Sequence, residues 1–258
     1  MQVPDRHFIY VPDYPLSFRE VAQAWRRLRR PVREGPPVEL DVPASLERRL
    51  RQGVAGPVVL RPRRRNTARL LLLVDRGEAM TPFLDFVDEV CRAIQHSGNL
   101  QLTTIYYFRD QPAQGASERA LRSLGGAALT SLDPLLGQIE PLQRGRFYTS
   151  PQMRTSLPVA RALDERARGA AVVILSDAGA AARSFEARRL LNTVAFLKAL
   201  RLRTTRIAWL NPLPRPDWQG ATAGQLARHI PMFPLDRPGL YAAVDVLRGR
   251  PAAVERPL

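Results

Sequence analysis

The spacing of apolar and polar residues divides the chain into two parts. In residues 17–30, apolar side chains recur at helical intervals between Ser17, a candidate N-cap, and Pro31, and residues 44–53 also have a helical pattern. The stretches between and after them are rich in proline, which moves the residue before it out of the helical region, so these stretches predict extended connectors. Residues 1–68 therefore predict an N-terminal arm with two helices, the first docked by its apolar face.

From residue 69 onward, short apolar runs alternate with amphipathic stretches. The apolar runs predict strands at 69–75, 100–108, 170–177, 204–210 and 230–235. The amphipathic stretches predict helices at 82–97, 156–167, 184–200, 222–229 and 237–248, with short helices in the proline- and glycine-broken region up to about 142. This alternation is typical of an α/β fold, a Rossmann-like, doubly wound, mostly parallel sheet, over residues 69–249 with a tail at 250–258.

Two aspartates follow the two most apolar strands. Asp75 ends the run LLLLVD, and Asp177 ends VVILSD. In an open parallel sheet the carboxyl ends of the strands face the crevice where ligands bind. A carboxylate in that position is stable when it caps a helix, meets a cation or binds a metal. Each aspartate alone reads as a helix cap or a loop residue, but the pair indicates a shared site.

The charge pattern raises the question of the partner. The formal charge is +15, Lys198 is the single lysine among the basic residues, and residues 1–69 alone carry a net charge of +8. The densest basic clusters are Arg26, Arg27, Arg29 and Arg30, and Arg63, Arg64 and Arg65. Neither cluster interleaves aromatic residues as a base-stacking surface does. We expect an acidic protein partner or a solvated face, with nucleic acid as the alternative.

Several classes of protein are disfavoured. No apolar run is long enough to span a bilayer, and the first ten residues lack the order of a secretory signal, so we expect a cytoplasmic protein without membrane contact. Cys91, the single cysteine, permits no internal disulfide and is expected to be a small buried apolar residue. The sequence contains none of the serine-hydrolase, phosphate-loop, dinucleotide or zinc-protease motifs. We therefore expect no enzymatic activity.

Several segments resemble one family. LLLLVDRGEAM is similar to the first strand and metal loop of von Willebrand factor A (vWA) domains, TSLPVARAL resembles their threonine-containing loop, and VVILSDAG resembles their later S-D-G segment. The tail from TTRIAWLNPLP to the final helix resembles CoxE-like vWA domains. The basic arm resembles that of proteins encoded beside MoxR-type AAA+ ATPases. The resemblance implies a vWA fold.

The resemblance also implies a metal-adhesion site, which the sequence matches in part. Asp75, Thr155 and Asp177 match metal ligands of the family, whereas Gly77 and Ala79 stand where the family has serines. Because two ligand positions lack a hydroxyl, the site is not preorganised, and magnesium binding is expected to be weak or lost. A weakly bound magnesium ion would complete its coordination with waters, which it retains readily. In the alternative, Arg76 or Glu78 of the same loop adjusts the charge, with the guanidinium replacing the cation.

The expected function is therefore that of an interaction module. Trp209 and Trp218, around a proline-rich loop, are either core residues or exposed anchors for a partner. The resemblance implies an adaptor or substrate recruiter for a MoxR-type AAA+ ATPase or a co-encoded subunit, in a bacterial multi-protein system such as a defence system. Loops around Asp75, Thr155 and Asp177 are expected to receive the partner. The alternative is a nucleic-acid-binding subunit that acts through the arginine-rich arm.

Overall fold

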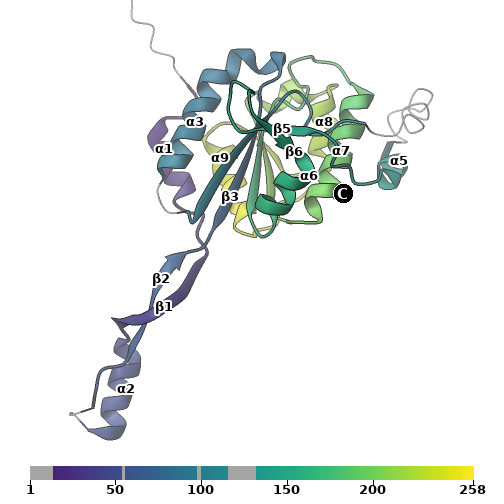
Figure 1. The fold of residues 1–258 in the computed structure, drawn as a ribbon. Helices are drawn as coiled ribbons and strands as arrows, with labels where there is room; N and C mark the ends of the chain where they lie inside the picture. The colour runs from purple at the N-terminus through teal and green to yellow at the C-terminus, as the bar shows by residue number, and fades with distance from the viewer. Residues whose placement is uncertain (1–13, 54–55, 98–99, 116–131) are drawn as a thin grey trace, which may run out of the picture.

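The computed structural model describes residues 14–53, 56–97, 100–115 and 132–258. Its centre is a seven-stranded sheet of order β6-β5-β4-β3-β7-β8-β9 (Figure 1). The strands are β3 (Arg69–Asp75), β4 (Leu102–Phe108), β5 (Arg146–Tyr148), β6 (Ser156–Pro158), β7 (Ala171–Leu175), β8 (Ile207–Asn211) and β9 (Met232–Pro234). Five are parallel, and β5 and β6 are antiparallel at one edge. The predicted α/β, doubly wound sheet is confirmed.

Helices cover both faces of this sheet. One face carries α1 (Phe18–Trp25), α3 (Leu84–His96) and α9 (Arg237–Leu247), packed on alternate residues of β3 such as Leu70 and Leu72. The other face carries α5 (Leu132–Gln138), α6 (Val159–Ala162), the π-helical turn η3 (Leu163–Ala167), α7 (Ala187–Arg201) and α8 (Thr222–Ala227), packed on Leu71 and Leu73. Because β3 is covered on both sides, it reads as an unbroken apolar run. Two short 3-10 helices, η1 (Glu78–Phe83) and η4 (Arg215–Trp218), follow strands β3 and β8.

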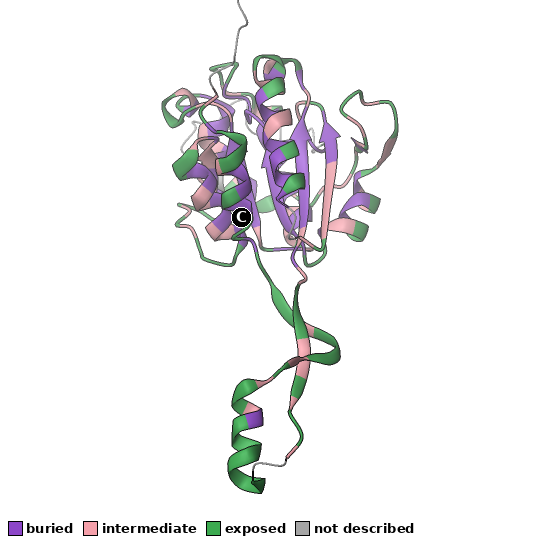
Figure 2. Ribbon diagram, turned by 90° about the vertical axis from the view of Figure 1, so that its left-hand side faces the viewer, coloured by how far each residue is buried: buried purple, intermediate pink, exposed green. Residues whose placement is uncertain are grey.

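The predicted N-terminal arm divides into two structural parts. Ser17 caps α1 in a reciprocal capping box with Glu20, and Trp25, Val21 and Leu28 lie in the same core as α3 and α9. Helix α1 thus belongs to the main domain. Residues 31–66 form a separate projecting hairpin of β1 (Pro31–Leu40), α2 (Val42–Gln52) and β2 (Leu60–Asn66), which extends away from the domain (Figures 1 and 2).

Local structure differs from the predictions at three places. The connectors around α2 are extended, as predicted, but they also pair as the antiparallel strands β1 and β2, which tolerate their prolines because both strands are edges. Residues 156–158 form strand β6 rather than a helix start, and strand β5 was missed. Both are three residues long, too short for a periodic signal. Of the short helices predicted up to about residue 142, the stretch 116–131 lies outside the described residues, as do residues 1–13 of the arm.

None of the helices in the described ranges combines the length and apolar character that crossing a bilayer requires.

Candidate functional site

The two strand-end aspartates converge at the carboxyl edge of the sheet. Strands β3 and β7 are parallel neighbours, with Val74 opposite Leu175, so Asp75 and Asp177 follow at the same rim. Both carboxylates are completely buried. This differs from the expected docking surface, because neither aspartate reaches solvent. In the loops that follow the two strands, the exposed residues include Glu78 and Ala181.

The Asp75 carboxylate is held by three neutral donors. Its Oδ1 accepts the backbone N–H groups of Gly77 and Asp110, each at 2.8 Å, and its Oδ2 accepts the Ser176 hydroxyl at 2.7 Å. These bonds join the β3–η1 loop, the end of β4 and the end of β7. Burial raises the pKa of Asp75 to about 6, and the bonds from Ser176, Gly77 and Asp110 and the nearby Arg189 offset part of that rise.

Arg189, in the first turn of α7, lies between the two carboxylates. Its Nη2 is 3.0 Å from Asp177 Oδ1 and 3.7 Å from Asp75 Oδ2, and its side chain is only 9% exposed. The second oxygen of Asp177 accepts the Ala181 N–H at 3.0 Å. One guanidinium therefore neutralises part of the negative charge of two buried carboxylates. Without a nearby cation, burial of these carboxylates would destabilise the fold.

Glycine at position 179 allows this arginine to reach the cluster. Gly179 has φ of 82°, and a β-carbon there would lie 3.2 Å from Arg189 Cδ. Asn211 Nδ2 donates to the Asp177 carbonyl at 2.8 Å, and Met80 Sδ receives the Asp177 N–H at 3.2 Å. The turn after β7 is thus fixed on several sides. It presents the Asp177 carboxylate inward, toward Arg189.

The loop residues expected to adjust the charge lie elsewhere. The Arg76 guanidinium pairs with Asp88 of α3 and lies over the Tyr107 ring, 5.1 Å from its centroid. Glu78 is exposed at the start of η1. The guanidinium that lies between the two carboxylates is that of Arg189, which the sequence analysis did not name. The choice of Arg76 was wrong, because Arg76 is already bound to α3.

Thr155 does not join the two aspartates. It is exposed just before β6, and its carbonyl accepts the Thr149 N–H at 3.0 Å. Within the described ranges, no hydrogen bond connects Thr155 to Asp75 or Asp177, and no group of three or more His, Cys, Asp or Glu side chains is placed to hold a metal ion. Gly77 is buried and Ala79 half-buried, and neither supplies an oxygen from its side chain.

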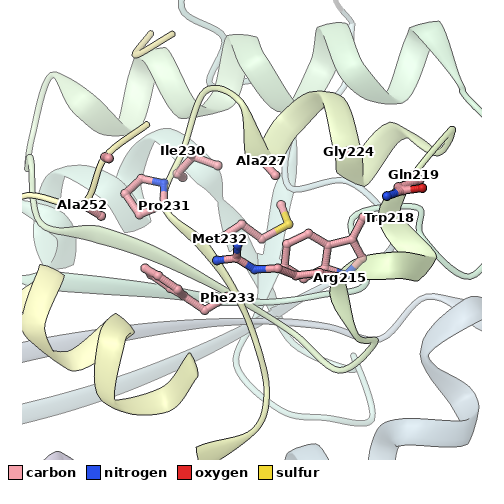
Figure 3. A pocket seen from close by; sticks show the side chains of 11 residues that line it. Arg215, Trp218, Gln219, Gly224, Ala227, Ile230, Pro231, Met232, Phe233 and Ala252 are labelled. Atoms are coloured by element: carbon pink, nitrogen blue, oxygen red, sulfur yellow. The ribbon is translucent and has the colours of Figure 1, made fainter. Parts of the chain in front are cut away.

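Both tryptophans of the proline-rich region are core residues. The Trp209 indole is buried in β8 and donates to the Ser176 carbonyl at 2.8 Å, which ties β8 to the site. Trp218 is also buried and donates to the Leu213 carbonyl at 3.0 Å. One edge of Trp218 lines a pocket of about 320 Å³ together with Met232 and Phe233 (Figure 3). Neither indole is an exposed anchor.

The arginines of the predicted basic clusters are all exposed. Arg27 lies 3.9 Å from Asp245 and over the Tyr241 ring, so it fastens α1 to α9. The remaining members are exposed around the end of α1 and on β2: Arg26, Arg29, Arg30, Arg63, Arg64 and Arg65. Between the two clusters, the Asn66 carboxamide accepts the Arg30 N–H at 2.7 Å, so the hairpin base is joined to the domain.

Of three comparisons with known proteins, one found a match, and it agrees with the fold. No curated protein and no solved structure matches the chain. The family described as "VWA domain containing CoxE-like protein" matches residues 17–233, a range that includes α1 and the projecting hairpin as well as most of the sheet. The chain therefore belongs to the family of CoxE-like proteins with a vWA domain.

Proposed function

We propose that this chain is a non-catalytic interaction module that recruits a partner or substrate to a MoxR-type AAA+ ATPase in a bacterial multi-protein system. In its Asp75–Arg189–Asp177 cluster, which we call the lock, the guanidinium stands in place of a metal ion and holds the two carboxylates together. The observation that carries this proposal is the position of Arg189 between the two carboxylates. A module of this kind recognises its partner by direct contacts instead of through a shared metal ion.

The arrangement of donors supports the lock. Magnesium prefers six oxygen ligands in near-octahedral geometry. Here the Asp75 oxygens already accept two N–H groups and a hydroxyl, and Arg189 brings a positive charge to the place where a cation would bind. Position 77 carries no hydroxyl. These residues do not fit a divalent cation without displacement of the guanidinium.

The test separates the lock from the recruiting role. Calorimetric titration of magnesium into the purified chain is expected to give no binding heat. A saturable magnesium isotherm for the wild-type chain would contradict the lock. In a second assay, a purified MoxR-type AAA+ ATPase from the same organism is immobilised with Mg·ATP present throughout, and binding of the chain is measured. Saturable binding is expected, and its absence would contradict the recruiting role.

The exposed arginines support a second candidate, a nucleic-acid-binding subunit. Arg63, Arg64 and Arg65 project consecutively from β2 and are all exposed. Phosphate contacts by such residues predict an affinity that falls steeply with salt. Filter binding of single- and double-stranded DNA and RNA at low and high salt tests this alternative, with an Arg63→Ala, Arg64→Ala, Arg65→Ala variant expected to lower the salt dependence.

A further inference from the structure

Helix α2, at the outer end of the projecting hairpin, exposes its apolar residues. Val42, Leu46 and Leu50 recur every four residues and form one stripe, with Leu46 55% and Leu50 88% exposed. The buried side chain of the helix is Ser45. Figure 2 draws nearly all of α2 as exposed. A helix that stabilises its own domain has the opposite arrangement, with the apolar stripe inward.

Polar contacts hold this helix in place. Asp41 caps it by accepting the Ala44 N–H at 3.2 Å. The Ser45 hydroxyl accepts the Val59 N–H at 2.9 Å and donates to the Val59 carbonyl at 3.3 Å, and the Asp41 N–H donates to the same carbonyl at 2.8 Å. The leucines are not used in these contacts. The helix is therefore presented in a defined orientation with its apolar stripe free.

Ion pairs hold together the two strands that carry the helix. Glu39 lies between Arg33, at 3.3 Å, and Arg61, at 3.2 Å, and Arg61 also reaches Asp41 at 3.5 Å. An isolated two-stranded hairpin is only marginally stable in water. Val38, Leu40, Val58 and Leu60 extend the exposed apolar surface from the helix onto the ends of the strands. The outer half of the hairpin therefore exposes apolar side chains on the helix and on both strands, which a second molecule could cover.

The charges around the stripe indicate the chemistry of that molecule. Arg48, Arg49 and Arg51 are exposed on the same helix, and helical spacing places Arg49 at the edge of the stripe. Residues 31–66 hold eight arginines against four carboxylates. A complementary surface has an apolar groove with acidic residues at its rim, the arrangement in which an amphipathic helix docks.

Two other occupants fit the hairpin less well. A second copy of this chain carries the same charge of +15, which opposes association. Nucleic acid would meet the four carboxylates, and residues 31–66 contain no aromatic side chain on which bases stack. Exposed leucines gain nothing from phosphates. A protein with an acidic, partly apolar groove satisfies both the stripe and the arginines.

We propose that the α2 tip of the projecting hairpin is the docking element of this protein, inserting Val42, Leu46 and Leu50 into an apolar, acid-rimmed groove of a protein partner. This inference rests on the proposed function, and it takes the MoxR-type AAA+ ATPase, to which the chain recruits its substrate, as the protein that carries this groove. It places recognition on the hairpin tip, far from the carboxyl end of β3, where Asp75 lies (Figure 1).

The first experiment measures binding of the full chain to the purified ATPase. Leu46→Ser with Leu50→Ser is expected to weaken binding at least about tenfold, because buried apolar anchors dominate interface energies. Arg49→Glu is expected to weaken it and to reduce its salt dependence. Leu202→Ser, at a leucine that is 70% exposed on the main domain, is the matched control and is expected to bind as the wild type does. Equal binding by the hairpin variants and the wild type would overturn the docking element while the recruiting role stands.

A second experiment is independent of the ATPase. A photo-crosslinking amino acid is placed at position 50 or, as control, at position 202, in the full chain expressed in its own host. The expected result is a protein adduct at position 50 alone, lost on Leu46→Ser, with the identified protein binding the purified wild-type chain at least about tenfold more tightly than the Leu46→Ser variant. Such an adduct with a different acidic protein retains the docking element and removes the ATPase as partner. An adduct with a second copy or with nucleic acid, or none above the control, overturns the proposal.

Discussion

The Asp110 carboxylate occupies the space that a side chain at position 77 requires. A β-carbon built on Gly77 overlaps Asp110 Oδ1, and the backbone of Asp110 is held in place because its N–H donates to Asp75. Asp110 also has φ of 58°, in the left-handed region. A side chain at position 77 therefore needs the Asp110 carboxylate to rotate away, so restoring the family serine there is not a neutral change.

Gly77→Ser is expected to lower the free energy of unfolding by about 1–3 kcal/mol, because the new side chain must displace Asp110. Urea denaturation measures the loss. Asp110→Gly in the same chain is expected to recover most of it, since glycine removes the overlap and accepts a positive φ. Ala79→Ser, at a half-buried position, is the control and is expected to change stability by less than about 0.5 kcal/mol. A fully stable Gly77→Ser single variant would refute the packing argument.

Removal of the Arg189 guanidinium leaves two buried carboxylates without a cation. Arg189→Ser is expected to lower the free energy of unfolding by roughly 3–5 kcal/mol. If the guanidinium replaces a metal, added magnesium should raise the Tm of Arg189→Ser and leave that of the wild type unchanged, because a ligand that binds only the folded state stabilises it. Arg188→Ser, at the exposed neighbour on the same helix, is the matched control. Equal losses from the two variants would show that the lock contributes nothing.

The position of the site was predictable from sequence, and its chemistry was not. Apolar runs ending in Asp75 and Asp177 identify two central strands, and parallel strands bring their carboxyl ends to one rim. Arg189 follows Asp177 by twelve residues and stands next to Arg188. Because most residues of α7 are buried, the periodicity of this helix does not show which of the two arginines faces the carboxylates. The available signal was electrostatic. Two buried carboxylates require a cation, and a basic residue in the first turn of a helix opposes the helix dipole unless it has such a partner.

The pKa of Asp75 predicts a dependence of stability on pH. Because burial raises this pKa from 3.8 to about 6, the contribution of Asp75 to stability is complete below about pH 4 and is lost as the pH rises through about 6. The loss is on the order of 3 kcal/mol, from about 1.4 kcal/mol per pKa unit. Carboxyls with lowered pKa values, such as Asp164, act in the opposite sense. To isolate Asp75 from these other carboxyls, the free energy of unfolding of Asp75→Asn is subtracted from that of the wild type at each pH. This difference is expected to fall between pH 4 and 7. A flat difference would contradict the raised pKa.

Cys91 is expected to be inert in the folded protein. The thiol is buried on α3, and burial, with Asp88 nearby, raises its pKa to about 12. Since the thiolate is the reactive form, modification by iodoacetamide at pH 8 is expected to be on the order of a thousandfold slower than that of an exposed cysteine. In denaturant the rate should rise to that of a model peptide. Rapid labelling under native conditions would show that this thiol is accessible and ionised.

Because α1 belongs to the main domain and residues 31–66 form a projecting hairpin, changes in these two parts are expected to affect stability unequally. Trp25 lies in the core formed with α3 and α9, so Trp25→Ala is expected to lower the free energy of unfolding by about 3–5 kcal/mol. Pro31 and Asn66 face each other at the hairpin base, so residues 33–64 can be replaced by a two-residue turn. This excision removes only a hairpin that projects from the domain, and it is expected to leave the Tm nearly unchanged while abolishing partner binding. A large drop in Tm on excision would show that the hairpin supports the fold, and its exposed leucines would then need a structural explanation rather than a partner.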